Sequence, residues 1–272
     1  MIELYNKIKS KYLRTLKAKS LKNTPYQENM TYQLENHNWY DPLVAGSDTF
    51  KNDLSSVKTI RGVIEVLKML QADKYIEFNL GYLNKGIEEF GEDWRCGDIT
   101  TALYSIGRKI NVENYLEIGV RRGRSMAMVA KLNPNVDIIG FDMWIQNYVG
   151  IENPGPEYVK EELKKVGHTG PVDFINGNSR HTVPLYLSQN PDKYFDLITV
   201  DGDHTKRGAK IDLKNVIPRL KIGGFLVFDD IVNPWHTQLD RLWKSLVVNS
   251  KRFTSYEYRE TGYGVGVAIK KW

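Results

Sequence analysis

The segment from Phe195 to Ile231 constrains the fold more than any other stretch of the chain. Two apolar runs, 195–200 and 225–228, flank a stretch in which apolar residues recur at helical spacing. A strand–helix–strand unit of this length makes two parallel strands joined by a right-handed crossover. The sequence therefore predicts an α/β sheet in this part of the chain.

Acidic residues follow both strands of this unit. Asp201 and Asp203 come after the first strand, and Asp229 and Asp230 end the second. If the strands are neighbours, about 5 Å apart, these carboxylates meet at the carboxyl edge of the sheet, where open α/β sheets bind ligands. Crowded carboxylates repel one another unless positive charge lies between them. A divalent metal ion is the simplest candidate for that charge.

Strands and helices alternate from Asn114 onwards. We expect further strands at 115–118, 136–141 and 172–175, and helices at 123–132, 157–166 and 182–189. Near the C-terminus, 252–259 and 265–270 flank the turn sequence Thr261-Gly262-Tyr263-Gly264, which is typical of a β-hairpin. The predicted fold class is α/β: a doubly wound, mostly parallel, Rossmann-like sheet with a C-terminal antiparallel hairpin.

The chain before this sheet has a different character. We expect residues 1–95 to form an N-terminal helical and loop appendage, and 96–272 the catalytic domain. Residues 1–22 carry seven Lys or Arg and one acid, and their apolar residues recur at helical spacing. A helix of this kind is expected to dock on the body or on a second subunit, which favours a homo-oligomer. Contact with an anionic membrane surface is the minority interpretation. For residues 23–54 the sequence leaves two interpretations open, a loop that covers an active site and a linker.

Charge and composition exclude several classes of protein. The net charge of +5 is concentrated in residues 1–22, so the remainder is nearly neutral and predicts no nucleic-acid-binding face. No apolar run approaches the roughly 20 residues of a membrane span. The N-terminus lacks an apolar signal segment, and the chain has one cysteine. These features predict a cytoplasmic protein.

The first strand-to-helix turn runs from Glu117 to Ser125. Its glycines, Gly119 and Gly123, let the backbone approach a ligand closely. The spacing lacks the G-x-G-x-x-G pattern of dinucleotide-binding proteins, which disfavours nicotinamide and flavin cofactors. Asp142 ends the second strand, where an acidic residue can accept hydrogen bonds from a ribose diol.

This combination resembles the class I S-adenosylmethionine-dependent methyltransferases, over about 115–270. The resemblance implies that the first turn holds the methionine and sugar side of S-adenosylmethionine, and that Asp142 binds the ribose. It also places Met143 or Trp144 on the adenine, and the segment after the third strand near the adenine amine. The implied donor-binding residues are Glu117, Gly119, Gly123, Ser125, Asp142, Met143, Asn178, Ser179 and Asp201.

The acidic cluster resembles that of the Mg²⁺-dependent sugar O-methyltransferases of macrolide and aminocoumarin biosynthesis, and of the cephalosporin-hydroxylase-like proteins. The resemblance implies a natural-product enzyme in which Asp201, Asp229 and Asp230 bind Mg²⁺. Asp203 is then the candidate general base, with His204 and His236 as alternatives.

The chemistry of such a site is coherent on its own terms. A sulfonium donor is already activated, whereas an alcohol is a poor nucleophile at neutral pH. A hard cation held by oxygen ligands stabilises the alkoxide, and a carboxylate or imidazole removes the proton. The expected acceptor is a small molecule or glycan, with a sugar hydroxyl favoured and a catechol-type phenol as the alternative. The rival functions are a hydroxylase-like or oxidoreductase enzyme and a non-catalytic scaffold that binds S-adenosylmethionine.

Overall fold

The computed structural model describes residues 45–147, 150 and 152–272. Val44–Lys271 form one compact unit, and the account below concerns that unit. The predicted helix at 1–22 and most of the predicted loop at 23–54 lie outside the described residues. The described end of that predicted loop is wrong as a loop, because Asp48–Leu54 form a helix. Within them, no helix combines the length and the apolar character needed to cross a membrane.

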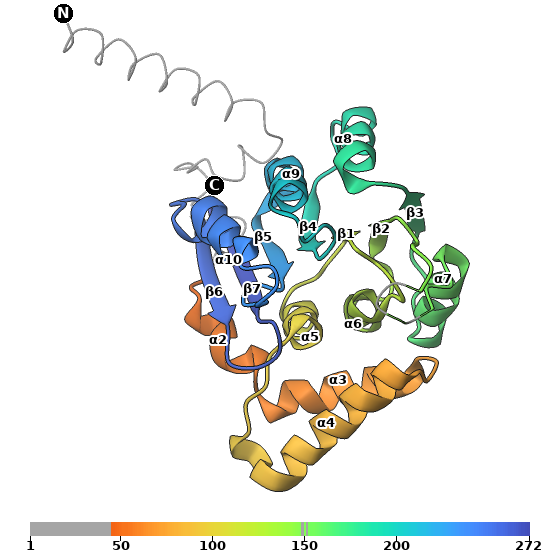
Figure 1. Cartoon of the computed structure of the whole chain (residues 1–272), viewed down its shortest axis with the longest axis vertical. Helices are drawn as coiled ribbons and strands as arrows, with labels where there is room; N and C mark the ends of the chain where they lie inside the picture. Colours follow the sequence, from red (N-terminus) through yellow and green to blue (C-terminus); the bar gives the residue numbers. More distant parts are fainter. Residues whose placement is uncertain (1–44, 148–149, 151) are drawn as a thin grey trace, which may run out of the picture. The chain divides into compact units, whose positions relative to one another are not determined.

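The unit is built on a seven-stranded sheet (Figure 1), with strand order β3-β2-β1-β4-β5-β7-β6. The five strands from β3 to β5 are parallel, and β7 and β6 form an antiparallel pair at the end. Their bounds are β1 Asn114–Ile118, β2 Asp137–Asp142, β3 Val172–Asn176, β4 Phe195–Val200, β5 Leu220–Asp229, β6 Phe253–Tyr258 and β7 Val265–Lys270. The predicted α/β fold, with its terminal antiparallel hairpin, is confirmed.

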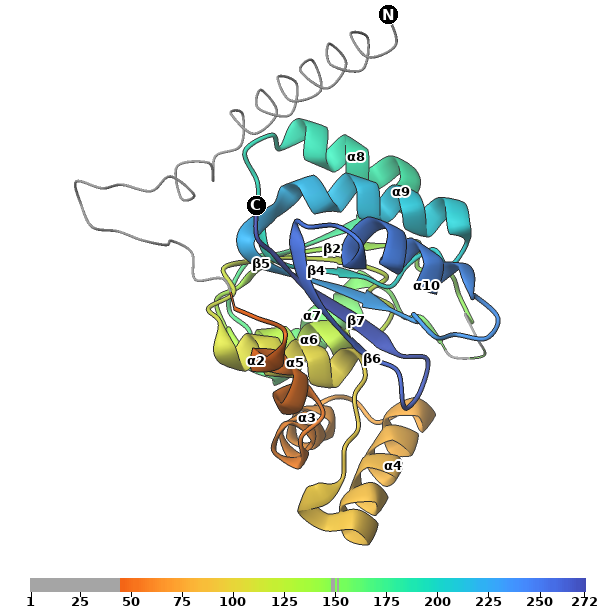
Figure 2. The same ribbon diagram turned by 90° about the vertical axis from the view of Figure 1, so that its left-hand side faces the viewer.

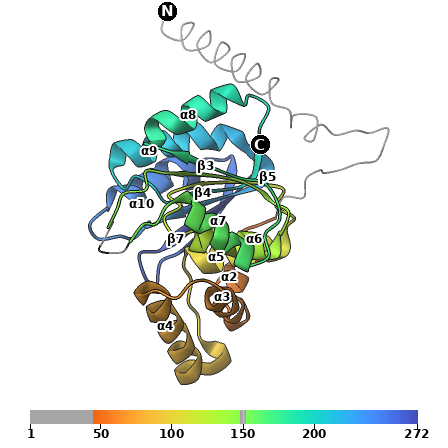
Figure 3. The ribbon, with the colours of Figure 1, turned by 90° about the vertical axis from the view of Figure 1, so that its right-hand side faces the viewer.

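Helices cover both faces of the sheet (Figures 2 and 3). One face carries α5 Ile99–Lys109, α6 Arg124–Leu132 and α7 Pro156–Lys165. The other carries α8 Ser179–Gln189, α9 Lys206–Val216 and α10 Gln238–Trp243, which continues as a π-helical turn, Lys244–Val248. Alternate residues of β1 point to opposite faces, so Tyr115 belongs to one apolar core and Leu116 to the other. Both cores are therefore fixed by the same strands.

Within the described residues, three α-helices precede α5: α2 Asp48–Leu54, α3 Val57–Met69 and α4 Lys74–Phe90. They pack on the α5 side of the sheet and join α5 through short 3₁₀ and extended segments, including Gly91–Asp93. Asp53 of α2 pairs with Arg108 of α5 and accepts a hydrogen bond of 2.6 Å from Ser105. These contacts fix the helices of the predicted appendage to the domain that carries the sheet.

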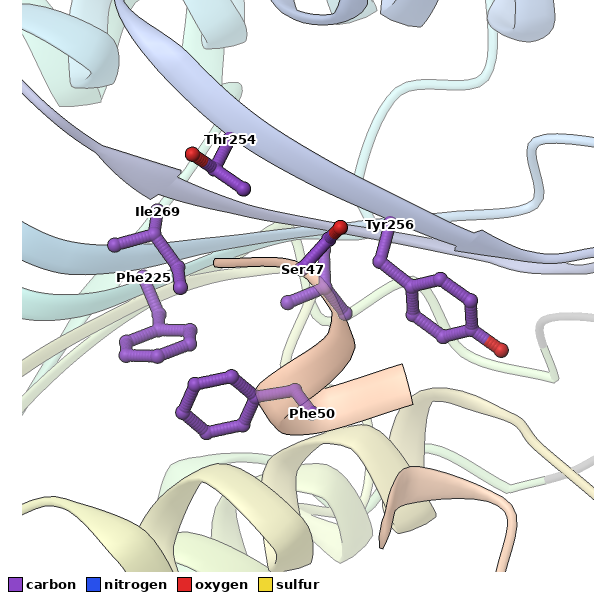
Figure 4. A pocket seen from close by; sticks show the side chains of 7 residues that line it. Ser47, Phe50, Phe225, Thr254, Tyr256 and Ile269 are labelled. Carbon is purple, nitrogen blue, oxygen red and sulfur yellow. The ribbon is translucent and has the colours of Figure 1, made fainter. Parts of the chain in front are cut away.

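Figure 4 shows a cavity between α2 and the β5–β7–β6 end of the sheet. Phe50 and Phe225 meet there edge to face, with ring centroids 4.6 Å apart. Its volume of about 10 Å³ is close to that of a single water-sized probe, which is too small for a metabolite. The cavity is a packing defect and lies away from the carboxyl edge.

Two boundaries differ by three or more residues from those expected. Strand β5 begins at Leu220, five residues before the apolar run, and its pairing with β4 shifts register between Phe195 and Leu197. Gly223 and Gly224 hide this part of the strand in the sequence, because glycine weakens the strand pattern and often marks an irregularity. Helix α8 begins at Ser179 because the Asn178 side chain caps it, accepting from the Arg180 N–H. A 3₁₀ turn, Ile217–Arg219, separates α9 from β5.

Candidate functional site

The carboxyl edge of the parallel strands carries the residues that the sequence singled out. In Figure 2 the chain that follows β5, the β6–β7 turn and the N-terminal end of α4 all lie on that side of the sheet. Among the described residues, the non-glycine residues with left-handed φ are Arg121, Trp144, Asn147 and Asp230. All four follow β1, β2 or β5 at this edge, and such backbone strain clusters at functional sites.

The β1 turn lies directly against the end of β4. Gly119 has φ +92°, and a Cβ built there would lie 2.0 Å from the carbonyl oxygen of Asp201. Gly123 has φ +72° and precedes the first residue of α6, which starts without a side-chain cap. The N–H groups of this helix end are therefore not satisfied by a capping side chain, which suits an anionic or polar ligand group.

Glu117 lies beneath this turn and is fully buried. Its carboxyl group accepts hydrogen bonds from the Tyr115 hydroxyl and, at 2.5 Å, from the Ser125 hydroxyl. Burial raises the pKa of Glu117 to about 8. Glu117 and Ser125, both predicted to bind the methyl donor, are thus brought together as a buried network that supports the start of α6.

Asp142 links the turns that follow β1 and β2. Its two oxygens accept one backbone N–H each, from Arg121 at 2.7 Å and from Trp144 at 2.6 Å. Each oxygen keeps a further lone pair for a ligand hydroxyl. Of the two residues predicted to pack on adenine, Met143 is half exposed, whereas Trp144 is buried edge to face against Phe174. The strained backbone at Trp144 directs these neighbouring side chains to different environments.

The segment after β3 serves the fold as well as the predicted adenine contact. Asn178 accepts from the Arg180 N–H at 3.0 Å through its side-chain oxygen, and Ser179 is buried at the start of α8. The amide nitrogen of Asn178 is not used in this cap. The prediction that these two residues contact adenine stays a prediction.

One electrostatic cluster, which we call the acid–histidine cluster, lies at the ends of β4 and β5. It consists of Asp201, Asp229, Asp230 and His204. The His204 Nε2 atom lies 3.3 Å from Asp201 Oδ1 and 3.4 Å from Asp230 Oδ2. Burial opposes charge on this ring, but the hydrogen bond to Asp201 and the neighbouring carboxylates raise its pKa. Burial and the charge of Asp201 raise the pKa of Asp230 and, with Asp230 also contributing, raise that of Asp229 well above its usual range. The cluster is therefore short of positive charge.

The three carboxylates predicted to bind a metal are close enough to influence one another, but they do not form a ready-made metal cage. Within the described part of the chain, no group of three or more His, Cys, Asp or Glu side chains is arranged to hold a metal ion. The His204 ring lies near the carboxylates of both Asp201 and Asp230.

Asp203, the predicted general base, faces away from this cluster into an ion pair. Its carboxylate contacts Arg180 Nη2 at 2.5 Å and accepts from the Thr205 N–H at 2.8 Å. Although burial opposes it, these hydrogen bonds and the charge of Arg180 lower the pKa of Asp203. A carboxylate stabilised in this way is a weak base. The alternative, His204, is stacked on His236 with ring centroids 5.1 Å apart.

Several residues of the site make contacts that the sequence does not indicate. Arg180 follows the third-strand motif, and only the fold brings it to Asp203. Asn233 is almost fully buried and donates to Asp230 Oδ2 at 2.9 Å, which fixes one acid of the cluster. Arg122 forms a buried ion pair of 2.8 Å with Asp73, and the guanidinium of Arg124 lies 3.7 Å from the ring centre of Tyr75. These arginines join the β1 turn to α4.

Residues 116–231 match the model of a protein family described as a methyltransferase domain. The fold is similar to the O-methyltransferase TomG from Streptomyces achromogenes in complex with SAM, with 17% identity, 75% of this chain and 92% of that chain covered, and a TM-score of 0.52. It is also similar to an O-methyltransferase from Bacillus cereus in complex with SAH (14% identity, 79% and 91% covered, TM-score 0.50). A third similar structure is the SAH-bound Podospora anserina methyltransferase PaMTH1 (16% identity, 96% of this chain and 96% of that chain covered, TM-score 0.50). The search of curated proteins found no match.

The family match covers the β1 turn, Asp142 and the acidic cluster, from the start of the parallel sheet to the end of β5. The predictions of the class I methyltransferase fold and of a methyltransferase domain are confirmed.

Proposed function

We propose that the protein is an O-methyltransferase that moves a methyl group from S-adenosylmethionine to a hydroxyl of a small molecule or glycan, with a sugar hydroxyl as the favoured acceptor. One observation carries this proposal: the β1 turn and the acid–histidine cluster are in direct contact. Gly119 abuts the carbonyl of Asp201, and β1, β4 and β5 are consecutive neighbours in the sheet. A donor at the turn therefore lies beside groups that activate an acceptor.

The donor side uses backbone more than side chains. The absence of Cβ atoms at Gly119 and Gly123 lets the turn pack closely against the Asp201 carbonyl and the Val159 side chain. The uncapped start of α6 offers N–H groups to a ligand. Asp142 is held by two backbone N–H groups, so its carboxylate is oriented before a ribose diol arrives. Met143 is exposed at the same edge and is suited to pack on the adenine. These residues align the sulfonium with the acceptor side of the edge.

The acceptor side uses the imidazole of His204 as the proton acceptor at Nε2. Asp201 and Asp230 orient the ring and stabilise it once it is charged. Stacking on His236 limits its rotation. Asp203, which is paired with Arg180, holds the loop between β4 and α9 in place and leaves the proton transfer to His204. An alcohol loses its proton to His204 as its oxygen attacks the methyl carbon, and the bond from that carbon to the sulfonium sulfur breaks to release S-adenosylhomocysteine.

We further propose that Asp201, Asp229 and Asp230 hold Mg²⁺. The donor set consists of carboxylate oxygens, which suit a hard divalent cation. Burial and, after it, the charge of neighbouring carboxylates raise the pKa values of Asp229 and Asp230, and a bound cation would offset both effects. When bound, the cation would supply Lewis-acid stabilisation of the acceptor oxygen. Because His204 already contacts two of these carboxylates, it competes with the cation for them.

Calorimetry tests the donor assignment. S-adenosylhomocysteine should bind the wild-type protein more tightly than NAD does, because the β1 turn lacks the second glycine of the pyrophosphate turn. Asp142→Ala should weaken that binding by about tenfold or more. Asp173→Ala, an exposed acid on β3, is the matched control and should leave it unchanged. Tighter binding of NAD would refute the assignment.

Turnover under chelation tests the metal. Methyl transfer should stop in EDTA and return when excess Mg²⁺ is added, and Asp229→Asn should not be rescued. His204→Asn should lower turnover while S-adenosylhomocysteine still binds. Full activity in a metal-free preparation would remove the metal from the proposal and leave methyl transfer itself intact.

A further inference from the structure

Two large aromatic side chains are exposed beside the acid–histidine cluster. Trp235 is 73% exposed and Tyr263 is 46% exposed. Their rings meet edge to face, with centroids 5.8 Å apart and an angle of 84° between the planes. Trp235 follows β5, and Tyr263 lies in the β6–β7 turn, so the pair joins two loops at the carboxyl edge. We call these two residues the aromatic pair.

The loops that carry the aromatic pair are fixed to each other. The Val232 N–H donates to the Tyr263 carbonyl at 2.7 Å, and the Ile231 N–H donates to the Gly264 carbonyl at 3.3 Å. Gly264 has φ +74°, and a Cβ there would lie 2.7 Å from the Val232 side chain. The glycine therefore permits this close contact, and the aromatic pair is mounted on a rigid support.

The same loop ties the aromatic pair to the acids. The backbone N–H of Trp235 donates to Asn233 Oδ1 at 3.0 Å, and the side-chain amide of Asn233 donates to Asp230 Oδ2 at 2.9 Å. The next residue, His236, stacks on His204. One short segment thus positions an exposed indole, a buried amide and the acid cluster, and their relative positions are set by hydrogen bonds.

We infer that Trp235 and Tyr263 form the surface on which the ring of the acceptor stacks while its hydroxyl faces His204 and Asp230. This inference rests on the proposed function. Aromatic faces carry negative charge density, so they attract C–H groups and the edges of other rings. Carboxylates and imidazole, in contrast, bind hydroxyls. A ligand that satisfies both is a carbon ring with adjacent hydroxyls on its edge.

Two kinds of molecule have this chemistry: a saturated sugar ring and a catechol-type aromatic ring. Both offer an apolar face and vicinal hydroxyls, and the aromatic pair accommodates either by stacking. Because the indole and phenol rings of the pair lie at 84° to each other, a bound ring stacks on one of them and touches the edge of the other. Both side chains are therefore specificity-determining residues for the acceptor.

Binding measured without turnover tests this inference separately from the proposed function. The probes are methyl α-glucopyranoside, methyl α-rhamnopyranoside and catechol, titrated by saturation-transfer NMR in the presence of S-adenosylhomocysteine. Trp235→Ala and Tyr263→Ala should each weaken binding of the preferred probe by about tenfold, whereas Trp235→Phe should retain most of it. Leu185→Ala, an exposed apolar residue on α8, is the control and should bind like wild type.

Each outcome decides the matter. Weaker probe binding in both alanine variants, with binding retained in Trp235→Phe, supports the inference. The probe that binds best shows whether the acceptor ring is a sugar or a catechol. Equal binding by wild type and Trp235→Ala overturns it, as does the absence of binding by every probe. S-adenosylhomocysteine affinity should be unchanged in all variants, which excludes misfolding. Turnover of a bound probe reports on the proposed function, so ring binding without methyl transfer would sink that function and leave the aromatic pair standing.

Discussion

Replacing Glu117 by glutamine should change how the stability of the protein depends on pH. Glu117 is buried and its pKa is raised to about 8 from 4.5, chiefly by burial. Between these two pH values the folded protein keeps a proton that the unfolded chain releases. The free energy of unfolding therefore falls as the pH rises through this window. Glutamine has a similar shape and cannot ionise, so the variant lacks this fall.

The magnitude follows from the two pKa values. A difference between about 8 and 4.5 corresponds to about 5 kcal/mol when the unfolded chain is fully ionised and the folded chain is not. This figure is a ceiling, because Ser125 and Tyr115 can reorient their hydroxyl groups to stabilise either form. We expect the variant to gain about 2 to 5 kcal/mol relative to wild type between pH 4.5 and pH 8.

Urea denaturation at a series of pH values measures the effect. All other titrating groups are shared by the two proteins, so they cancel in the difference between the free energies of unfolding. The difference should grow steadily with pH up to about 8 and then level off. Parallel curves for wild type and Glu117→Gln would show that Glu117 is ionised in the folded protein, and would refute the raised pKa on which this prediction rests.

Two further predictions follow from the structure, and a third follows from the sequence of residues 1–22. Gly119→Ala should abolish binding of S-adenosylhomocysteine and lower the melting temperature, because its Cβ would lie 2.0 Å from a carbonyl oxygen. Gly81→Ala, with open space around it, is the control. Equal behaviour of the two variants would contradict this reasoning. Arg122→Ala should cost about 3 kcal/mol in urea denaturation by leaving Asp73 without its partner, whereas Arg61→Ala, from an exposed pair, should cost less than about 1 kcal/mol. Deleting residues 1–22 should lower the number of chains per particle, as measured by light scattering. An unchanged number of chains with lost liposome binding would favour the membrane interpretation.

The arrangement of the sheet could be predicted because it depends on local patterns. Apolar runs that end in acids mark strands, and helical spacing between them requires a parallel crossover. The sequence therefore predicts that Asp201 and Asp229 lie at the ends of adjacent strands, and the register of β4 and β5 agrees. The same patterns do not fix the boundaries of elements at glycines and caps, as the early start of β5 and of α8 shows.

The direction of individual side chains could not be predicted, because it depends on packing between distant segments. Asp203 and His204 are neighbours in the sequence, yet Arg180 from α8 holds the first and the carboxylates hold the second. Trp144 points into the core because its backbone adopts φ +51°, which no local pattern indicates. The aromatic pair arises only when the loop after β5 meets the β6–β7 turn.

The most direct test of the proposed function is to identify the atom that receives the methyl group. S-adenosylmethionine labelled with ¹³C in its methyl group would be incubated with the protein, Mg²⁺ and the preferred ring probe. The ¹³C NMR spectrum of the product distinguishes methyl groups on oxygen, nitrogen and carbon. The account predicts a single O-methyl signal that disappears in His204→Asn. A methyl group on nitrogen or carbon, or no transfer by a protein that binds both ligands, would contradict it.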